Sequence, residues 1–568
     1  MVQYSNVKKD CHYRYKIALR KEKAAAHKVQ ADNIYSDLLN RDSTSFWKSW
    51  NSLNKVGDSH VSRIAGETDE KNIANVFASY FESVYSGHDT PEHTSLRNEY
   101  NSEFTHYYSE HINDDIMSSY LSWSDMITLA SKVKIGKATA GIVKPQHFMH
   151  GGPRLLQHFQ ILFNSMLQHG FVPTDFLKGT ISPIVKDSQG DISDPSNYRG
   201  ITLSSLPSKL FEFAIQLKTS ELLHTDDLQF GFKRKTSTSH ALYCLKTTVD
   251  HFTNHNSRVF AAFLDCTKAF DRISHHGLFT ELIKRKIPLC ILLCLCFWYG
   301  NMSSEVKWST QKSRSFPVPL GIKQGGINSP DFFACYFNGL TQLLRQLKLG
   351  CHIGNLFLGS LFFADDIVLL APTRSALQRM IDRCHSYCSQ YGLAFNAKKS
   401  KTMIFSKTAF DKDNIKPLDM NGTLDCVNQV KYLGTNIISN PALSFSHEED
   451  LRSFYRASNS VLNQIAAANE PVLMQLLYSH CVPCFSYAAA MKDYTSRQMN
   501  ECTVAVNDAI RKIFTYNRWE SVRTLRQDLG YPAFIEIFAK ARNEFQQSLP
   551  HHHNSTVSRL CLLAPTVE

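Results

Sequence analysis

The 568-residue sequence lacks the features that would place it in a membrane, disulfide-bonded or zinc-binding class. Its longest apolar run, near residues 287–299, is too short to span a bilayer and contains Pro288. Its 15 cysteines follow no disulfide spacing, and Cys481 and Cys484 have no second Cys/His pair after them to complete a zinc site. No signal peptide is visible at the N-terminus. These absences predict an intracellular protein with reduced thiols, no membrane association and no disulfide-linked partner.

Basic residues outnumber acidic ones everywhere except in one segment. Residues 1–55 hold 11 Lys/Arg against 5 Asp/Glu, residues 56–130 hold 3 against 13, and the remainder carries the rest of a net charge of +11. A basic surplus over most of the chain indicates a polyanionic partner such as nucleic acid, although a merely soluble basic protein would have the same surplus. The length predicts more than one domain.

Two adjacent aspartates, Asp365 and Asp366, separate the apolar runs 361–363 and 367–370. This pattern predicts two buried strands joined by a tight turn that carries both carboxylates. Neighbouring carboxylates at the edge of an apolar sheet repel each other and are costly to desolvate, and a hard cation such as Mg²⁺ relieves both problems. The alternative is a solvated Asp-Asp turn, because aspartate is common in turns.

A third carboxylate follows another buried strand. The continuous apolar run 259–264 ends in Asp265, and side chains at the exit of a buried strand often line active sites. We expect Asp265 to meet Asp365 and Asp366 across the sheet. Asp271 is expected only to support the site, or to stabilise the N-terminal turn of a helix.

Three further segments carry groups suited to nucleotides. Lys186 and Arg199 lie on two strands expected to pair, where they suit a triphosphate or are ordinary surface cations. Residues 319–330 form a glycine-rich loop before a helix, which allows close backbone approach to a ligand. Residues 229–235 interleave aromatic and basic side chains, as in a nucleic-acid contact or a surface loop with an aromatic anchor.

In this order, the motifs closely resemble those of reverse transcriptases of the non-LTR (LINE-type) retrotransposon kind. Residues 263–271 (FLDCTKAFD) match the first catalytic motif and residues 363–366 (FADD) match the second aspartate motif. The other matches are Asn197-Tyr198-Arg199, Gln324-Gly325-Gly326 with Ser329-Pro330, Asn396 with Lys399, and Tyr432-Leu433-Gly434. The resemblance covers residues 71–440 strongly and 446–545 more loosely.

The resemblance implies an α+β fold of the right-hand polymerase type, with fingers, a palm built on an antiparallel sheet, and a helical thumb. It implies two-metal transfer of a nucleotide from a dNTP to the 3′-hydroxyl of a DNA primer on an RNA template. The implied roles are Asp265, Asp365 and Asp366 as ligands of two Mg²⁺ ions, with Mn²⁺ as a substitute; Lys186, Arg199, Gln324 and Gly325 in nucleotide binding; Lys399 in protonating pyrophosphate or contacting nucleic acid; and Lys233, Arg234, Tyr432, Leu433 and Gly434 in contacting nucleic acid.

Phe270 carries the implied choice of sugar. It stands five residues after Asp265, where the family places an aromatic ring against the ribose 2′ position. Polymerases of RNA viruses typically place an aspartate at that spacing, and here Asp271 comes one residue too late. The resemblance therefore implies use of dNTPs.

The expected domains are a basic helical arm at 1–60, an N-terminal extension with an acidic loop at 61–130, fingers and palm at 131–440, a helical thumb at 441–549 and a flexible tail at 550–568. The arm is expected to contain a helix over residues 13–39, which could face nucleic acid or serve as a solvated linker. Gly200 departs from the proline that many family members carry.

No endonuclease motif is found, and residues 1–60 resemble the linker after an endonuclease, so target nicking is not expected of this polypeptide. The expected setting is a ribonucleoprotein of the nucleus and cytoplasm. The alternative function is a catalytically silent, maturase-like or decayed RNA-binding relative. A protein-interaction module built on the helical C-terminus would explain none of the aspartates.

Overall fold

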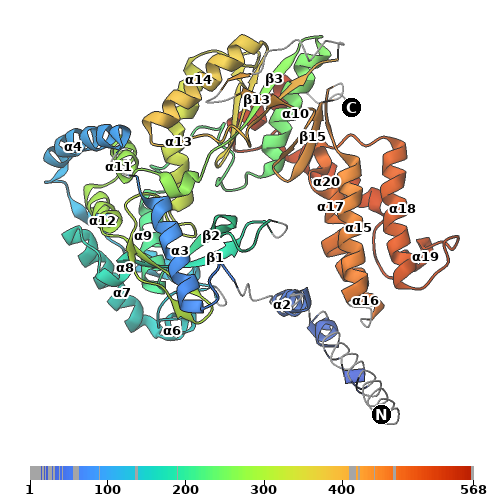
Figure 1. Ribbon diagram of the computed structural model, residues 1–568, viewed down its shortest axis with the longest axis horizontal. Helices are drawn as coiled ribbons and strands as arrows, with labels where there is room; N and C mark the ends of the chain where they lie inside the picture. The colour runs from blue at the N-terminus through green and yellow to red at the C-terminus, as the bar shows by residue number, and fades with distance from the viewer. Residues whose placement is uncertain are drawn as a thin grey trace, which may run out of the picture. The chain divides into compact units, whose positions relative to one another are not determined.

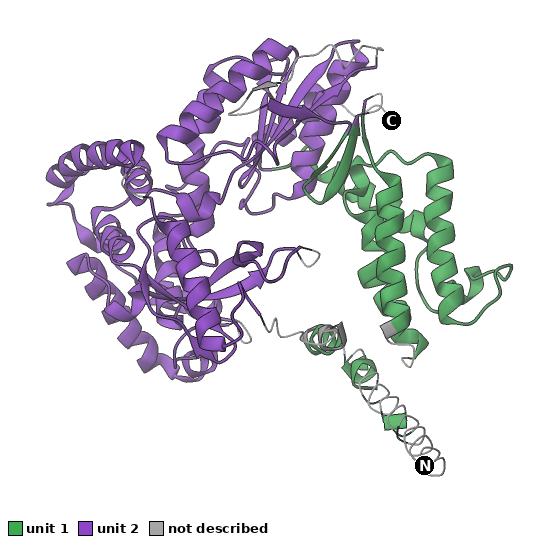
Figure 2. Cartoon of the chain, in the orientation of Figure 1, with its two compact units in different colours: residues 1–60, 429–438, 443–552 green, residues 61–428, 439–442, 553–568 purple. Residues whose placement is uncertain are grey.

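The computed structural model describes residues 42–54, 63–87, 90–134, 138–187, 190–407, 418–419, 423–439, 442–464 and 469–564, with scattered positions between 15 and 40. The chain divides into two compact units (Figure 2), one of residues 1–60, 429–438 and 443–552 and one of residues 61–428, 439–442 and 553–568. The helix expected over 13–39 lies mostly outside the described residues.

A six-stranded sheet in the second unit has the order β12-β13-β11-β3-β10-β9. Strand β3 lies inside it and pairs antiparallel with both β10 and β11. Helices α10 and α14 pack on the sheet (Figure 1), which explains why β3 is an unbroken apolar run instead of an alternating one. The bounds are β3 Val259–Asp265, β9 Ser360–Phe363, β10 Asp366–Ala371, β11 Lys401–Phe405, β12 Leu418–Asp419, β13 Thr423–Cys426, α10 Thr238–Asn254 and α14 Arg374–Gln390.

A second sheet has the order β2-β1-β4-β5, with β6 paired to β4. β1 runs antiparallel to β2 and parallel to β4, and helix α3 packs against β4 and β5. A Cβ atom at Gly200 would lie 2.8 Å from the Phe81 ring of α3, so this packing leaves no room for a side chain at residue 200. The bounds are β1 Lys178–Val185, β2 Tyr198–Leu203, β4 Ser303–Trp308, β5 Gln311–Lys312, β6 Phe316–Pro317 and α3 Glu70–Tyr85.

The remaining elements of this unit surround the two sheets. The apolar run at 287–299 forms α12, most of which is buried, and no helix in the described ranges is long and apolar enough to cross a membrane. The bounds are α4 Pro91–His111, η1 Ile116–Ser119, α5 Trp123–Ser131, α6 Pro145–His150, α7 Gly152–His169, α8 Thr174–Leu177, η2 Pro195–Asn197, α9 Leu206–Thr219, η3 Ala269–Arg272, α11 His275–Lys284, α12 Leu289–Gly300, α13 Ser329–Gln346, β7 His352–Ile353, β8 Leu356–Phe357 and α21 Ser555–Leu563.

Within the extension at 61–130, where an acidic loop is expected, residues 91–111 instead form helix α4. Helix α4 begins after Thr90, whose side chain accepts a hydrogen bond from the His93 N–H, and it packs against α11. Of its 21 residues only His93, Leu96 and Tyr107 are buried. Three buried positions produce too weak a periodicity to predict a helix, and its packing against α11 is what places it.

The flexible tail expected at 550–568 also contains a helix. Asn554 caps α21 by accepting from the Val557 N–H, and Val557 and Leu560 are fully buried. The helix contacts α10 and β8 of the second unit. The segment is polar overall, and three buried residues are enough to dock one face of this nine-residue helix.

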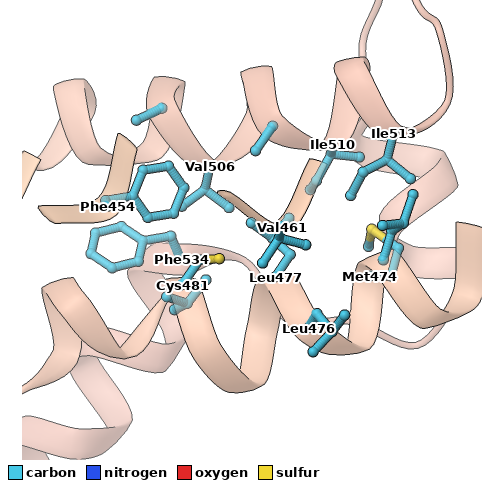
Figure 3. Close-up of a cluster of buried hydrophobic side chains, with 14 of the residues drawn as sticks. Phe454, Val461, Met474, Leu476, Leu477, Cys481, Val506, Ile510, Ile513 and Phe534 are labelled. Atoms are coloured by element: carbon cyan, nitrogen blue, oxygen red, sulfur yellow. The ribbon is translucent and has the colours of Figure 1, made fainter. Parts of the chain in front are cut away.

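The first unit is mostly helical and also contains the small sheet β14–β16; the helical domain expected at 441–549 falls largely within it. Side chains from its helices form one apolar core (Figure 3), to which Phe46 and Trp50 of α2 also belong. The bounds are α2 Ser43–Asn54, β14 Gln429–Tyr432, β15 Thr435–Ser439, β16 Leu443–Phe445, α15 His447–Gln464, α16 Glu470–Leu476, η4 Leu477–Cys481, α17 Pro483–Ser486, η5 Ala489–Met491, α18 Ser496–Ile513, α19 Arg523–Asp528 and α20 Phe534–Ser548.

Candidate active site

The three aspartates lie together at the ends of two neighbouring interior strands of the six-stranded sheet, as the sequence predicts. Asp366 is the first residue of β10 and stands opposite Asp265, the last residue of β3, in the antiparallel register. Asp365 precedes Asp366 in the two-residue turn between β9 and β10. Because facing residues of antiparallel strands are close neighbours, the register brings together carboxylates that are a hundred residues apart in the chain.

Burial raises the pKa values of all three carboxyl groups, and repulsion between carboxylates raises those of Asp365 and Asp366 further. Burial is the larger cause for all three, and it raises the pKa of Asp366 to about 6 with help from the charges of Asp365 and Asp265. The Asp265 charge also raises the pKa of Asp365. Lys399 and Arg199 act in the opposite sense on Asp265 and Asp365 respectively. The site therefore concentrates negative charge that only partly meets compensating cations.

The turn at residues 394–400 wraps around the end of β3 and brings Lys399 to the site. Asn396 N–H donates to the Asp265 carbonyl oxygen at 2.8 Å, and Asp265 N–H donates to Ser400 Oγ at 3.1 Å. The Asn396 side chain in turn accepts from the Lys399 N–H at 3.2 Å. Both backbone groups of Asp265 are thus held by this turn, and the exposed Lys399 lies near enough to oppose the rise of the Asp265 pKa.

Lys186 and Arg199 also belong to this cluster of charges. Arg199 lies opposite Ile184 in the β1–β2 ladder, and Lys186 follows the end of β1 and donates through Nζ to the Ser196 carbonyl at 3.0 Å. Burial lowers the pKa of Lys186, and the charges of Lys268, Arg199 and Lys399 lower it further. A lysine whose pKa is lowered by neighbouring cations is suited to a polyanion such as a triphosphate.

Gln324 joins the glycine-rich loop to the short helix after β3. Its Nε2 donates to Asp271 Oδ1 at 2.8 Å, and its carbonyl accepts from the Thr202 N–H at 2.8 Å. Gly325 adopts a φ of +110°, and a Cβ there would lie 3.1 Å from the Thr202 carbonyl oxygen. The loop therefore follows the end of β2 so closely that only glycine fits at residue 325 without strain.

Phe270 stands in η3 within a group of three aromatic rings. It stacks on Phe333 with ring centroids 4.2 Å apart and planes 9° apart, and the exposed Phe232 meets its edge at 5.8 Å. Phe333 is fully buried. Contacts on a face and an edge restrict the Phe270 ring to one orientation.

The expected nucleic-acid contacts are arranged in different ways. Lys233 Nζ donates to the carbonyls of Thr225 and Asp226 and to Asp227 Oδ1, so its side chain is engaged within its own loop, whereas Arg234 is exposed. Tyr432, Leu433 and Gly434 lie in the first unit, at the turn from β14 to β15. Within that turn, the Leu433 carbonyl accepts a hydrogen bond from Tyr487 Oη at 2.8 Å.

Sequence reasoning missed two side chains that hold the site. Ser400, which accepts the Asp265 N–H, is fully buried. Gln229, also buried, contacts the Ala364 peptide just before Asp365. The segment 229–235 attracted notice only for its mixture of aromatic and basic residues, and no local pattern indicates a side chain that contacts a turn 135 residues away.

Asp271 provides a test of the electrostatics of the site. Burial raises the pKa of Asp271 to about 6, although the Gln324 amide and the charges of Lys268 and Lys186 lower it. A carboxyl group with a raised pKa stabilises the folded state at low pH, and this contribution is lost as pH rises from about 4 to about 6. Asp271→Asn is therefore expected to be about 1–2 kcal/mol more stable than the wild type at pH 8 and to lose that advantage near pH 4.

Urea unfolding of both proteins at pH 4, 6 and 8 measures this difference. The Asn variant keeps an acceptor for Gln324, so the comparison isolates the charge. An equal free-energy difference between the two proteins at all three pH values would contradict the raised Asp271 pKa.

The three aspartates are chemically suited to a divalent metal ion. Carboxylate oxygens are hard ligands, and a cation would offset the repulsion that raises the Asp365 and Asp366 pKa values. In the part of the chain that the structure describes, no three Asp, Glu, His or Cys side chains are already grouped as metal ligands. The donor set therefore fits a metal by its chemistry, and the carboxylate side chains would have to move to coordinate one ion together.

Comparison with known proteins agrees with this geometry. Residues 184–437 match the model of the family described as reverse transcriptase (RNA-dependent DNA polymerase). The chain is 24% identical over 454 residues to the RNA-directed DNA polymerase from mobile element jockey of Drosophila funebris, covering 77% of this chain and 48% of that protein. It is 26% identical over 281 residues to the Pol polyprotein of the type-1 retrotransposable element R2 of Nasonia vitripennis, covering 48% of this chain and 27% of that protein.

A telomerase structure from Candida albicans aligns over 73% of this chain and 69% of its own, at 11% identity and a TM-score of 0.35. The chain spans about half the length of the jockey protein, the more extensive match of these two relatives.

The region that matches the family model, residues 184–437, contains the three aspartates together with Lys186 and Arg199. Its mixed sheets and helices form the α+β fold of the right-hand polymerases. The chain is therefore similar to reverse transcriptases over residues 184–437, and the relatives named here are polymerases of mobile and retrotransposable elements.

Proposed function

We propose that this chain is an RNA-directed DNA polymerase, which transfers nucleotides from dNTPs to the 3′-hydroxyl of a DNA primer on an RNA template. The observation that carries the proposal is the pairing of Asp366 with Asp265, next to Asp365, at the ends of two neighbouring strands near Lys399 and Arg199. A structural turn would not need three carboxylates whose pKa values are raised by burial. A nucleotidyl-transfer site needs them to hold metal ions.

The proposed cofactor is a pair of Mg²⁺ ions, which Mn²⁺ would replace, with Asp265 and Asp365 as the main ligands and Asp366 completing the set. When bound, such ions neutralise phosphate charge and lower the pKa of the attacking hydroxyl. Asp265 is held for this task by the 394–400 turn on both of its backbone groups. Catalysis of this kind consists mainly of positioning and charge neutralisation.

The remaining side chains have proposed roles in binding. Lys186 and Arg199 would bind the triphosphate, whose charge would relieve the repulsion that lowers the Lys186 pKa. Gln324 and Gly325 would position the nucleotide, since their loop is fixed on β2 and Asp271. Lys399 would protonate pyrophosphate or contact nucleic acid. The other proposed nucleic-acid contacts are Lys233, Arg234, Tyr432, Leu433 and Gly434, of which Lys233 would first have to leave its own loop.

Primer extension tests the activity. The full chain, supplied with an RNA template, an annealed DNA primer, dNTPs and Mg²⁺, is expected to extend the primer, while Asp365→Ala is expected to be inactive. A folded wild type that leaves the primer unextended with Mg²⁺ and with Mn²⁺ would contradict the proposal and favour the alternative, a silent RNA-binding relative. Such a relative would still bind RNA, which a filter-binding assay on the same preparation measures.

Metal binding can be tested without activity. Mg²⁺ or Mn²⁺ at millimolar concentration is expected to raise the melting temperature of the wild type at pH 7.5, because binding to the folded state stabilises it. The effect should be much smaller in the variant Asp265→Asn/Asp365→Asn. An equal rise in both proteins would place the metal elsewhere.

We propose the setting to be an intracellular ribonucleoprotein of the nucleus and cytoplasm, with template RNA and DNA as partners.

A further inference from the structure

The turn that carries Asp365 is braced by a segment far from it in sequence. Phe230 N–H donates to the Phe362 carbonyl at 2.7 Å, and Phe362 N–H donates to the Leu228 carbonyl at 2.8 Å. Residues 228–230 thus lie along the outer side of β9, in parallel alignment at Gln229 and Phe362. This contact covers the edge of the sheet nearest the turn and aims the Gln229 side chain at it.

The Gln229 amide contacts both backbone groups of Ala364. Its Oε1 accepts from the Ala364 N–H at 3.0 Å and from the Gly231 N–H at 2.9 Å, and its Nε2 lies 3.5 Å from the Ala364 carbonyl oxygen. Ala364 has a φ of +56°, in the left-handed region that non-glycine residues avoid. Gln229 is only 2% exposed. A buried amide therefore holds a strained peptide immediately before Asp365.

Gly231 also packs directly against the turn that carries Asp365. A Cβ at residue 231 would lie 2.4 Å from the Ala364 nitrogen, closer than any side chain allows. The backbone of residues 229–231 therefore approaches the Ala364 peptide as closely as glycine permits. The two segments are therefore in such close contact that a larger residue at 231 would displace Ala364 and Asp365.

The bracing segment is itself anchored at its start. Asp226 accepts two hydrogen bonds from the Arg345 guanidinium, at 2.7 and 3.1 Å. Asn554 Nδ2 donates to the Asp227 carbonyl at 2.7 Å, and Ser555 donates to the Asp227 carboxylate from its N–H and its hydroxyl. The returning C-terminal segment and α13 therefore fix the residues that lead directly to Gln229.

We infer that Gln229 is a positioning residue, which sets the place of the Asp365 carboxylate through the Ala364 peptide; this inference rests on the proposed polymerase function. Gln229 is buried, and the contacts of its amide are with the backbone of Ala364 and Gly231, so it is placed to act through the Ala364 peptide. Its effect should therefore fall on the chemical step and on metal dependence, and leave dNTP affinity nearly unchanged.

Asn164 supplies a matched control in the same unit. Its Oδ1 accepts from the Leu121 N–H at 2.8 Å and its Nδ2 donates to the Leu121 carbonyl at 3.1 Å. Like Gln229, it holds both backbone groups of one residue through a single side-chain amide. It joins α7 to the segment before α5, outside the set of residues proposed for the active site. Gln229→Met and Asn164→Leu therefore remove the same kind of contact from two places.

The two variants are compared in steady-state primer extension and in thermal melting. We expect Gln229→Met to lower kcat by roughly 10- to 100-fold, to keep the KM for dNTP within about twofold, and to raise several-fold the Mg²⁺ concentration that gives half the maximal rate. We expect Asn164→Leu to lower the melting temperature while it keeps kcat within about threefold. Equal kcat values in Gln229→Met and wild type, or equal losses in both variants, would overturn the inference.

Hydrogen exchange separates this inference from the proposed activity. In wild type, a peptide covering residues 361–366 should exchange slowly, and Gln229→Met should speed its exchange while the peptide that contains Leu121 stays protected. Unchanged exchange in residues 361–366 would overturn the positioning role even in an active enzyme. If Gln229→Met exchanges faster at residues 361–366 but the wild type never extends a primer, the positioning role of Gln229 is supported. That result would count against the polymerase function alone.

Discussion

Asp265→Asn is expected to abolish primer extension and at the same time to raise the melting temperature of the metal-free protein. The carboxylate is a proposed metal ligand, and its loss should remove about 4 kcal/mol of transition-state stabilisation, roughly a thousandfold in rate. The rise in stability follows from burial, which raises the pKa of Asp265, and from its charge, which raises the pKa values of Asp365 and Asp366. Removing that charge relieves both costs.

The expected gain is on the order of 1 kcal/mol, or roughly 2 °C in a unit of this size. Melting is measured at pH 7.5 in EDTA and again in Mg²⁺, where wild type should recover the difference because it binds the ion and the variant binds it less. Ser400→Ala serves as a control, since it loses the contact with the Asp265 N–H while it keeps all three charges. A variant that is inactive and also less stable than wild type in EDTA would indicate a structural role for Asp265 instead.

Phe270→Ala is expected to let ribonucleotides enter the growing chain. The ring is stacked on the buried Phe333 and touched at its edge by Phe232, so it keeps its place instead of swinging aside. If it stands against the sugar 2′ position, truncation to alanine opens room for a hydroxyl. We expect the preference for dNTPs over NTPs, measured as the ratio of kcat/KM values, to fall by roughly 100-fold, about 2.7 kcal/mol.

Phe232→Ala is the matched control, because it removes the neighbouring ring and leaves Phe270 on Phe333. Its preference for dNTPs should change by less than about fivefold. Single-nucleotide extension with each dNTP and its NTP gives both ratios. A Phe270→Ala protein that still extends primers with dNTPs and rejects NTPs as strongly as wild type would show that another residue selects the sugar.

Several features of the site were predictable because their signals are local. The apolar runs on either side of Asp365 and Asp366 indicate strands, and two aspartates between them indicate a turn, so the β9–β10 hairpin could be placed from about ten residues. The continuous apolar run before Asp265 indicates a strand buried on both faces, as β3 is. The motif order then points to the family without any knowledge of contacts.

Other features depend on contacts between distant segments and had no local signal. Helices α4 and α21 have too few buried positions for a clear period, and they are placed by the surfaces that they cover. Lys233 resembles a free basic residue in sequence, yet its ammonium group is engaged by the carbonyls of its own loop. Polar residues such as Lys233 and Gln229 have several possible partners, and packing selects among them.

The sequence by itself determined that the protein carries three aspartates at strand ends, a phenylalanine five residues after the first, and cations before them, because strand, turn and motif spacing are properties of short segments. Only the tertiary structure decided that β10 pairs with β3 in the register that sets Asp366 opposite Asp265. It also decided that Ser400 contacts the backbone of Asp265 and that Gln229 contacts the backbone of Ala364, next to Asp365. Register and bracing are long-range choices, made by the burial of whole faces and by the pairing of buried polar groups.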